Sequence, residues 1–222
     1  MQIAKIAVLT SMILAVLFAP SSITRGATIA IGPSAFPSGS PLITFDGLPF
    51  GLEVNGLTVG GATFQTTLAG VATNGLADID NGPGVTNNVN PPNVVSFANP
   101  PGGALVVNLP AAETLFGFGY AIETVGTVPN AATINLFNGS TSVGSISFTG
   151  NSDPFFTGGF AGVQSTLPFN QAVLTFSQVG AAYAVDNIRF GVPEPASLIM
   201  MSLGALGIFV TVLWQRRLQI VG

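Results

Sequence analysis

The 222-residue chain lacks cysteine and histidine, and it carries only 5 basic and 9 acidic residues, or 6% charged residues against about 25% in an average soluble protein. Without cysteine, disulfides, thiol nucleophiles, zinc–thiolate sites and iron–sulfur clusters are excluded. Without histidine, a Ser–His–Asp triad and histidine metal ligands are excluded as well. Because nucleic-acid binding needs a basic surface, we also expect no nucleic-acid partner.

The N-terminus has the layout of a secretory signal peptide. Lys5 provides the positive charge of the n-region. Ile6–Ala19 is an almost wholly apolar stretch that is shorter than a typical membrane-spanning helix. Small residues follow, and Thr28-Ile29-Ala30 is one acceptable cleavage site. We therefore expect a signal peptide at 1–27, with its end between residues 22 and 30, and export of the rest of the chain.

A second apolar segment, Ala196–Trp214, runs for 19 residues without a charge near the C-terminus. As a helix it would extend about 28 Å at about 1.5 Å per residue, close to the thickness of a bilayer core. Arg216 and Arg217 follow, and the positive-inside rule places them in the cytoplasm. We therefore expect one transmembrane helix at 196–214, a cytoplasmic tail at 218–222, and the middle of the chain outside the cytoplasm.

The residues just before that segment read Val192-Pro193-Glu194-Pro195-Ala196. Two prolines lack amide donors and fix φ, so this stretch stays extended and accessible to a protease. Pro-Glu-Pro, one apolar helix and an arginine pair at the C-terminus together resemble the PEP-CTERM sorting domain over residues 192–217. The tail that follows is longer than such signals usually carry.

This resemblance implies an exported protein of an exopolysaccharide-producing Gram-negative bacterium. Its precursor would be anchored in the inner membrane, and its partners would be the export machinery and an exosortase, the protease that processes such proteins. The sorting and processing signal would consist of Val192, Pro193, Glu194, Pro195, Ala196, Arg216 and Arg217.

The ectodomain that remains, residues 28–191, shows period-two alternation, which is typical of β-strands. Phe116, Phe118 and Tyr120 fall on one face of a strand, with glycines on the other face. Asn138-Gly139 predicts a hairpin with a type I′ turn. Strands are expected at 42–46, 57–66, 94–97, 105–109, 115–120, 132–137, 145–148, 155–160, 172–177 and 182–190, and a long loop region at 73–101. This pattern predicts an all-β fold, an antiparallel β-sandwich or jelly roll.

Two groups of carboxylates are candidate calcium ligands. Asp78 and Asp80, followed by Asn-Gly, look like half of a calcium loop, and the alternative is a solvated turn. Asp186 would lie on the apolar face of its strand, together with Ala184 and Ile188, if that strand is regular. There it either accepts backbone N–H bonds from a neighbouring loop or binds calcium. No other cofactor is expected.

Catalysis is not expected, since nothing in the sequence brings two of the few carboxylates together across a sugar. We expect a non-enzymatic protein of the cell surface or of an extracellular matrix such as a biofilm, delivered by its sorting signal. The alternative is a carbohydrate-binding module for exopolysaccharide, with or without calcium. An exposed Tyr120 or Tyr183 in a groove would favour this alternative.

Overall fold

The computed structural model describes residues 26–82 and 86–193, and these residues form an all-β domain in which every strand pairing is antiparallel. The elements are β1 (Thr28–Ala30), the 3₁₀ turn η1 (Pro33–Ala35), β2 (Leu42–Ile43), β3 (Thr58–Val59), β4 (Ala62–Leu68), β5 (Val71–Ala72), β6 (Asp78–Asp80), β7 (Asn93–Ser96), β8 (Gly103–Ile122), β9 (Val128–Asn138), β10 (Thr141–Ser152), β11 (Thr157–Phe176) and β12 (Tyr183–Gly191). The expected all-β class is confirmed.

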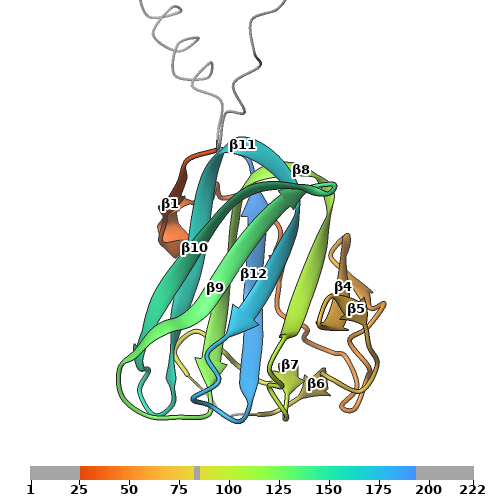
Figure 1. Cartoon of the computed structure of the whole chain (residues 1–222), viewed down its shortest axis with the longest axis vertical. Helices are drawn as coiled ribbons and strands as arrows, with labels where there is room; N and C mark the ends of the chain where they lie inside the picture. Colours follow the sequence, from red (N-terminus) through yellow and green to blue (C-terminus); the bar gives the residue numbers. More distant parts are fainter. Residues whose placement is uncertain (1–25, 83–85, 194–222) are drawn as a thin grey trace, which may run out of the picture.

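Two long strands, β8 and β11, build two layers because each bends where its pairing changes register. The first half of β8 pairs with β4 and with the second half of β11; its second half pairs with β12 and with the first half of β11. Pro110 and Pro168 lie near these bends, where an interrupted ladder requires no amide donor. The β12 layer contains β1, β11, β8, β12, β7 and β6, and the β9 layer contains β10, β9, β11, β8 and β4 (Figure 1).

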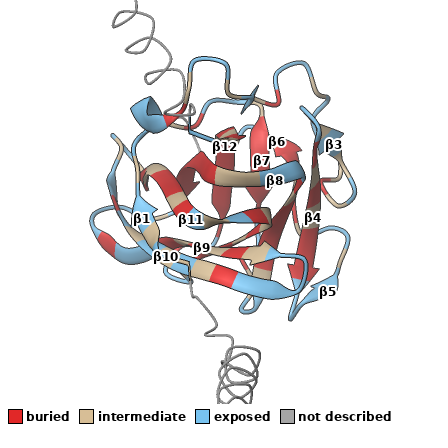
Figure 2. Ribbon diagram, turned by 90° about the horizontal axis from the view of Figure 1, so that it is seen from above, coloured by how far each residue is buried: buried red, intermediate tan, exposed pale blue. Residues whose placement is uncertain are grey.

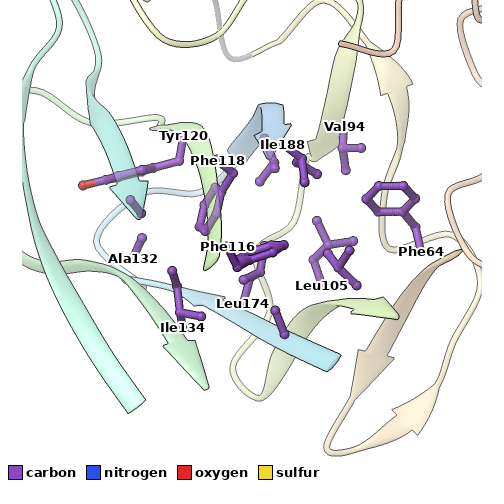
Figure 3. Packing of buried hydrophobic residues seen from close by; sticks show 14 of the residues in the cluster. Phe64, Val94, Leu105, Phe116, Phe118, Tyr120, Ala132, Ile134, Leu174 and Ile188 are labelled. Atoms are coloured by element: carbon purple, nitrogen blue, oxygen red, sulfur yellow. The ribbon is translucent and has the colours of Figure 1, made fainter. Parts of the chain in front are cut away.

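The hydrophobic core fills the space between the two layers, where Figure 2 shows the buried residues concentrated. Phe116, Phe118 and Tyr120 point into it from β8, as the alternation predicted. Phe176 of the β9 layer meets the ring of Phe118 edge-on, with 6.2 Å between ring centroids. Ile134 lies on the same side of the core as Leu174, opposite the aromatic row (Figure 3). These contacts across the gap make the domain a β-sandwich.

The outer face of the β12 layer is covered as well. Residues 86–92, the covering loop, place the Asn88 carbonyl oxygen where a Cβ at Gly119 would lie. The ring of Phe160 similarly occupies the space beside Gly117. Val89 of the covering loop belongs to a small buried cluster with Val95, Ala121 and Ala184. The second half of β8 is consequently buried on both faces, and its glycines are required by what lies over them.

The expected hairpin after β9 is confirmed, but the expected type I′ turn is wrong. Asn138 pairs with Thr141, so the two-residue loop is Gly139-Ser140. Of these residues, only Gly139 has a positive φ, 58°. A glycine at the first central position is the requirement of a type II′ turn, whereas type I′ needs two positive φ values. The expected loop region at 73–101 also contains the short strand β6.

Several expectations fall on residues that the structure does not describe. These are residues 1–25 of the signal peptide, Glu194, Pro195, Ala196, Arg216, Arg217, the transmembrane helix at 196–214 and the tail at 218–222. Within residues 26–82 and 86–193, no helix is both long and apolar enough to cross a membrane.

Candidate functional site

The sorting signal begins immediately after the last strand of the sandwich. β12 ends at Gly191, and the next two residues, Val192 and Pro193, are exposed and belong to no strand. Gly191 pairs with Leu115, which pairs with Gln164, which pairs with Ile29 of β1. Both ends of the described domain therefore lie in one row across the sheet, at the end where β8 and β11 bend.

Asp186 lies on the outer face of the β12 layer, so its expected place among the core residues of β12 is wrong. It shares this face with Ala184, as expected, and is opposite Gly119. The regular alternation then breaks, because Asn187 has φ 53° and the register shifts between Asp186 and Arg189. This bulge turns Ile188 into the core while Asp186 faces outward.

The covering loop nevertheless buries Asp186, which is only 2% exposed. Its Oδ2 accepts the backbone N–H of Asn90 at 3.0 Å and the side-chain amide of Asn187 at 3.2 Å. The hydrogen bond from the covering loop is the first of the two roles expected for this carboxylate. Burial raises the pKa of Asp186 to about 6, the charge of Asp46 raises it too, and hydrogen bonds from Asn90 and Asn187 lower it.

One oxygen of Asp186 is left without a donor, and so is a neighbouring amide oxygen. Asp186 Oδ1 is buried and has no hydrogen-bond partner among the described residues. Asn93 is 0% exposed, and its Oδ1 likewise has none. Asn93 Nδ2 donates to the Asn90 carbonyl at 3.4 Å. Because buried polar atoms are almost always paired, two such oxygens on adjacent strands call for an explanation.

Asp78 and Asp80 lie on β6 at the edge of the same layer, with Ile79 between them in the core. The backbone of Asp78 pairs with that of Glu53 in an isolated antiparallel β-bridge. The Glu53 carboxylate accepts the backbone N–H groups of Asn55 and Gly75. Burial raises the pKa of Asp78, and the charges of Asp80 and Glu53 raise it further. No three acidic side chains among the described residues gather into a metal-binding group.

A hollow of about 140 Å³ opens beside these carboxylates. Glu53 and Asp78 lie on its wall together with the ring of Phe97, which is 58% exposed. An exposed aromatic ring beside hydrogen-bond acceptors is the combination that can hold a sugar, whose faces are apolar and whose edges carry hydroxyls. Glu53 could not be found from a local sequence pattern, because its neighbour Asp78 is 25 residues further along the chain.

The two tyrosines whose exposure in a groove would favour the carbohydrate-binding alternative are core residues. Tyr120 is 1% exposed and Tyr183 is 4% exposed, and burial raises the pKa of each to about 12. Tyr183 stacks on Phe176, with 4.1 Å between ring centroids. A groove lined by these tyrosines is therefore excluded.

Comparison with known proteins identifies the C-terminal segment. Residues 191–217 match the PEP-CTERM protein-sorting motif, which confirms the resemblance over residues 192–217. The chain therefore carries this motif from the last residue of β12 onward. A comparison with curated proteins found no match.

Two solved structures illustrate the likenesses found for the fold. The enzymatically active domain of tailspike protein 4 from bacteriophage CBA120 is 18% identical, with a TM-score of 0.35; the alignment covers 62% of this chain but only 21% of the tailspike chain. A carbohydrate-binding module of family 29 is 15% identical, with a TM-score of 0.30, over 76% of this chain and 92% of the module. TM-scores this low establish neither a shared fold nor a shared function.

Proposed function

We propose that this chain is a non-enzymatic protein of the cell surface or extracellular matrix, exported and then processed by an exosortase. The observation that carries the proposal is the PEP-CTERM motif at residues 191–217, placed directly after a β-sandwich. Pro193 is exposed where β12 ends, which suits a segment that a protease must reach. The precursor is anchored in the inner membrane by residues 196–214 until it is processed.

The acid pair nearest to a hollow is poorly suited to catalysis, which supports a non-enzymatic role. Both oxygens of Glu53 accept backbone N–H groups, at 3.2 Å from Asn55 and 2.7 Å from Gly75. These bonds engage both carboxylate oxygens with the protein's own backbone, which makes the group a poor partner for proton transfer to a substrate. The domain has no histidine or cysteine to replace it.

The test is to follow the full chain in a host with and without a working exosortase. We expect the protein from the competent host to lack Trp214 by intact-mass measurement, with cleavage near residues 193–196. Replacing Pro193, Glu194 and Pro195 together by alanine should leave the uncleaved precursor in the membrane fraction. Deleting residues 218–222, which lie outside the matched motif, is the control and should leave processing unchanged. Uncleaved protein in the competent host would contradict the proposal.

A second candidate function, binding of exopolysaccharide, is favoured by the hollow beside Phe97. The ring of Phe97 would stack on a sugar, while Asp78 would accept hydrogen bonds from its hydroxyls. We expect Phe97→Ala to weaken binding of the processed protein to the producing cell's polysaccharide by about tenfold or more, which corresponds to about 1.4 kcal/mol. The control is Phe155→Ala, since Phe155 is 75% exposed and does not line the hollow. Equal binding by both variants would exclude this site.

A further inference from the structure

Beneath the covering loop, two buried oxygen atoms have no hydrogen-bond donor among the residues that the structure describes: Asp186 Oδ1 on β12 and Asn93 Oδ1 on β7. The two side chains lie on the same face of the β12 layer. Asn93 and Val95 face outward because Val94 between them belongs to the core, and Asp186 faces outward with Ala184. The orphaned oxygens therefore share one covered surface.

Continuing the register of β7 and β12 by one residue beyond its last pair brings these two residues opposite each other. Val94 of β7 pairs with Val185 of β12, and Asn93 and Asp186 are the next residues in that antiparallel register. Side chains directly opposite in such a ladder have Cβ atoms about 4.5–5.5 Å apart. Asp80 of β6 pairs with Asn93 from the other side. One row across β6, β7 and β12 thus holds two carboxylates with an amide between them.

Two carbonyl oxygens of the covering loop, both acceptors, lie close to this row. The Asn90 carbonyl already receives Asn93 Nδ2, an arrangement that directs the Asn93 oxygen away from it. The Asn88 carbonyl lies over Gly119, which is the partner of Asp186 on β8. Among the described residues no salt bridge neutralises the Asp186 carboxylate, and the nearby acid Asp46 adds negative charge. An isolated buried carboxylate in such a place is unfavourable unless a positive charge joins it.

We propose that a divalent cation of the calcium type binds beneath the covering loop, with Asp186 Oδ1 and Asn93 Oδ1 as ligands. Calcium accepts carboxylate, side-chain amide and carbonyl oxygens in flexible geometry, and water completes its coordination. With one buried carboxylate in the ligand set, the affinity falls in the class of extracellular modules, with Kd about 10⁻⁴–10⁻³ M. The cation would link β7 to β12 beneath the covering loop, which is a structural role outside the cell.

The test uses the exported, processed protein after treatment with EDTA, titrated with calcium chloride at pH 7.5. Calcium at about 100 times its Kd should raise the melting temperature by about 5–10 °C, because the cation binds only the folded state.

Asp186→Asn keeps an acceptor for the Asn90 N–H but removes the charge, and it should lose the calcium response. Asn93→Asp adds a carboxylate ligand, so it should lower the calcium-free melting temperature and tighten calcium binding. The control is Asp78→Asn, two residues before Asp80 on β6, and its melting temperature should respond to calcium as that of the wild type does.

Two results would overturn the proposal. If the Asn93 amide instead turns to donate to Asp186, the wild type will show no response to calcium, and calcium will not rescue Asn93→Asp. If Asp186 is instead protonated and its O–H donates to Asn93 Oδ1, the wild type will melt at a higher temperature at pH 5 than at pH 7.5. Calcium will then have no effect at either pH. In that case Asp186→Asn will lose the pH response and keep the higher stability at pH 7.5.

Discussion

Replacing Gly119 by alanine should detach the covering loop from the β12 layer. An added Cβ would overlap the Asn88 carbonyl oxygen and lie 2.8 Å from its carbonyl carbon. These are backbone atoms, so no side-chain rotation can make room for the methyl group. Because the strand is held on both sides by ladders to β11 and β12, the covering loop is the part that must move.

The magnitude follows from the contacts that the covering loop makes. Its removal breaks the hydrogen bond from Asn187 to the Asn88 carbonyl at 2.9 Å and the one from Asn90 to Asp186 at 3.0 Å. It also exposes Val89, which is fully buried. With about 1 kcal/mol for the neutral hydrogen bond and about 1.5–3 kcal/mol each for the charged one and the valine, the free energy of unfolding falls by about 4–7 kcal/mol.

Urea unfolding and hydrogen exchange of the Asn90 amide measure the two consequences separately. The control is Gly117→Ala on the same strand, whose new Cβ would meet the rings of Phe160 and Phe36 instead of backbone. Rings can shift, so this control should cost about 1–3 kcal/mol and leave the Asn90 amide protected. A Gly119→Ala protein that unfolds within about 1 kcal/mol of the wild type, with Asn90 still protected, would refute this account of the loop.

Three further changes test other parts of the molecule. Asn187→Val places a β-branched residue at φ 53° and should lower the free energy of unfolding in urea by about 1–3 kcal/mol; an unchanged value would mean that the bulge carries no strain. Phe118→Ala empties the space between the layers and should lower that free energy by about 3–5 kcal/mol, whereas a loss below about 1 kcal/mol would show that the core collapses around it. Arg216→Glu with Arg217→Glu should reduce processing, measured by intact mass, because the pair orients the helix that presents Pro-Glu-Pro. Processing at the normal rate would show that the pair is no part of the signal.

The sequence was informative where the signal is local. Alternation of apolar and polar residues identified the strands and hence the all-β class, because the side-chain period of a strand is visible within a few residues. The PEP-CTERM motif was equally visible, since it is a contiguous pattern at residues 191–217. Local patterns do not reveal where a strand bends. The expected strands at 105–109 and 115–120 are the two halves of β8, and those at 155–160 and 172–177 fall largely within β11.

The surroundings of Asp186 could not be predicted from the sequence, for two physical reasons. Its face was assigned on the assumption of a regular strand, but the bulge at Asn187 reverses the face of every later residue. Asparagine tolerates positive φ better than most residues, which is a weak signal at best. Asn90, which donates to Asp186, lies 96 residues earlier in the chain, and the pairing of β7 with β12 brings its loop beside β12.

The placement of the two chain ends also determines which part of the domain is available to partners. Ile29 and Gly191 lie in one row at the end where β8 and β11 bend. The turns after β8, β10 and β11 lie at the opposite end, since Ile122 pairs there with both Thr157 and Tyr183. Phe97 follows directly on Ser96, which pairs with Tyr183, so the hollow lies toward that same end. A polymer bound in the hollow, as proposed above, would therefore lie at the end of the domain opposite Gly191, away from the segment that an exosortase would cleave.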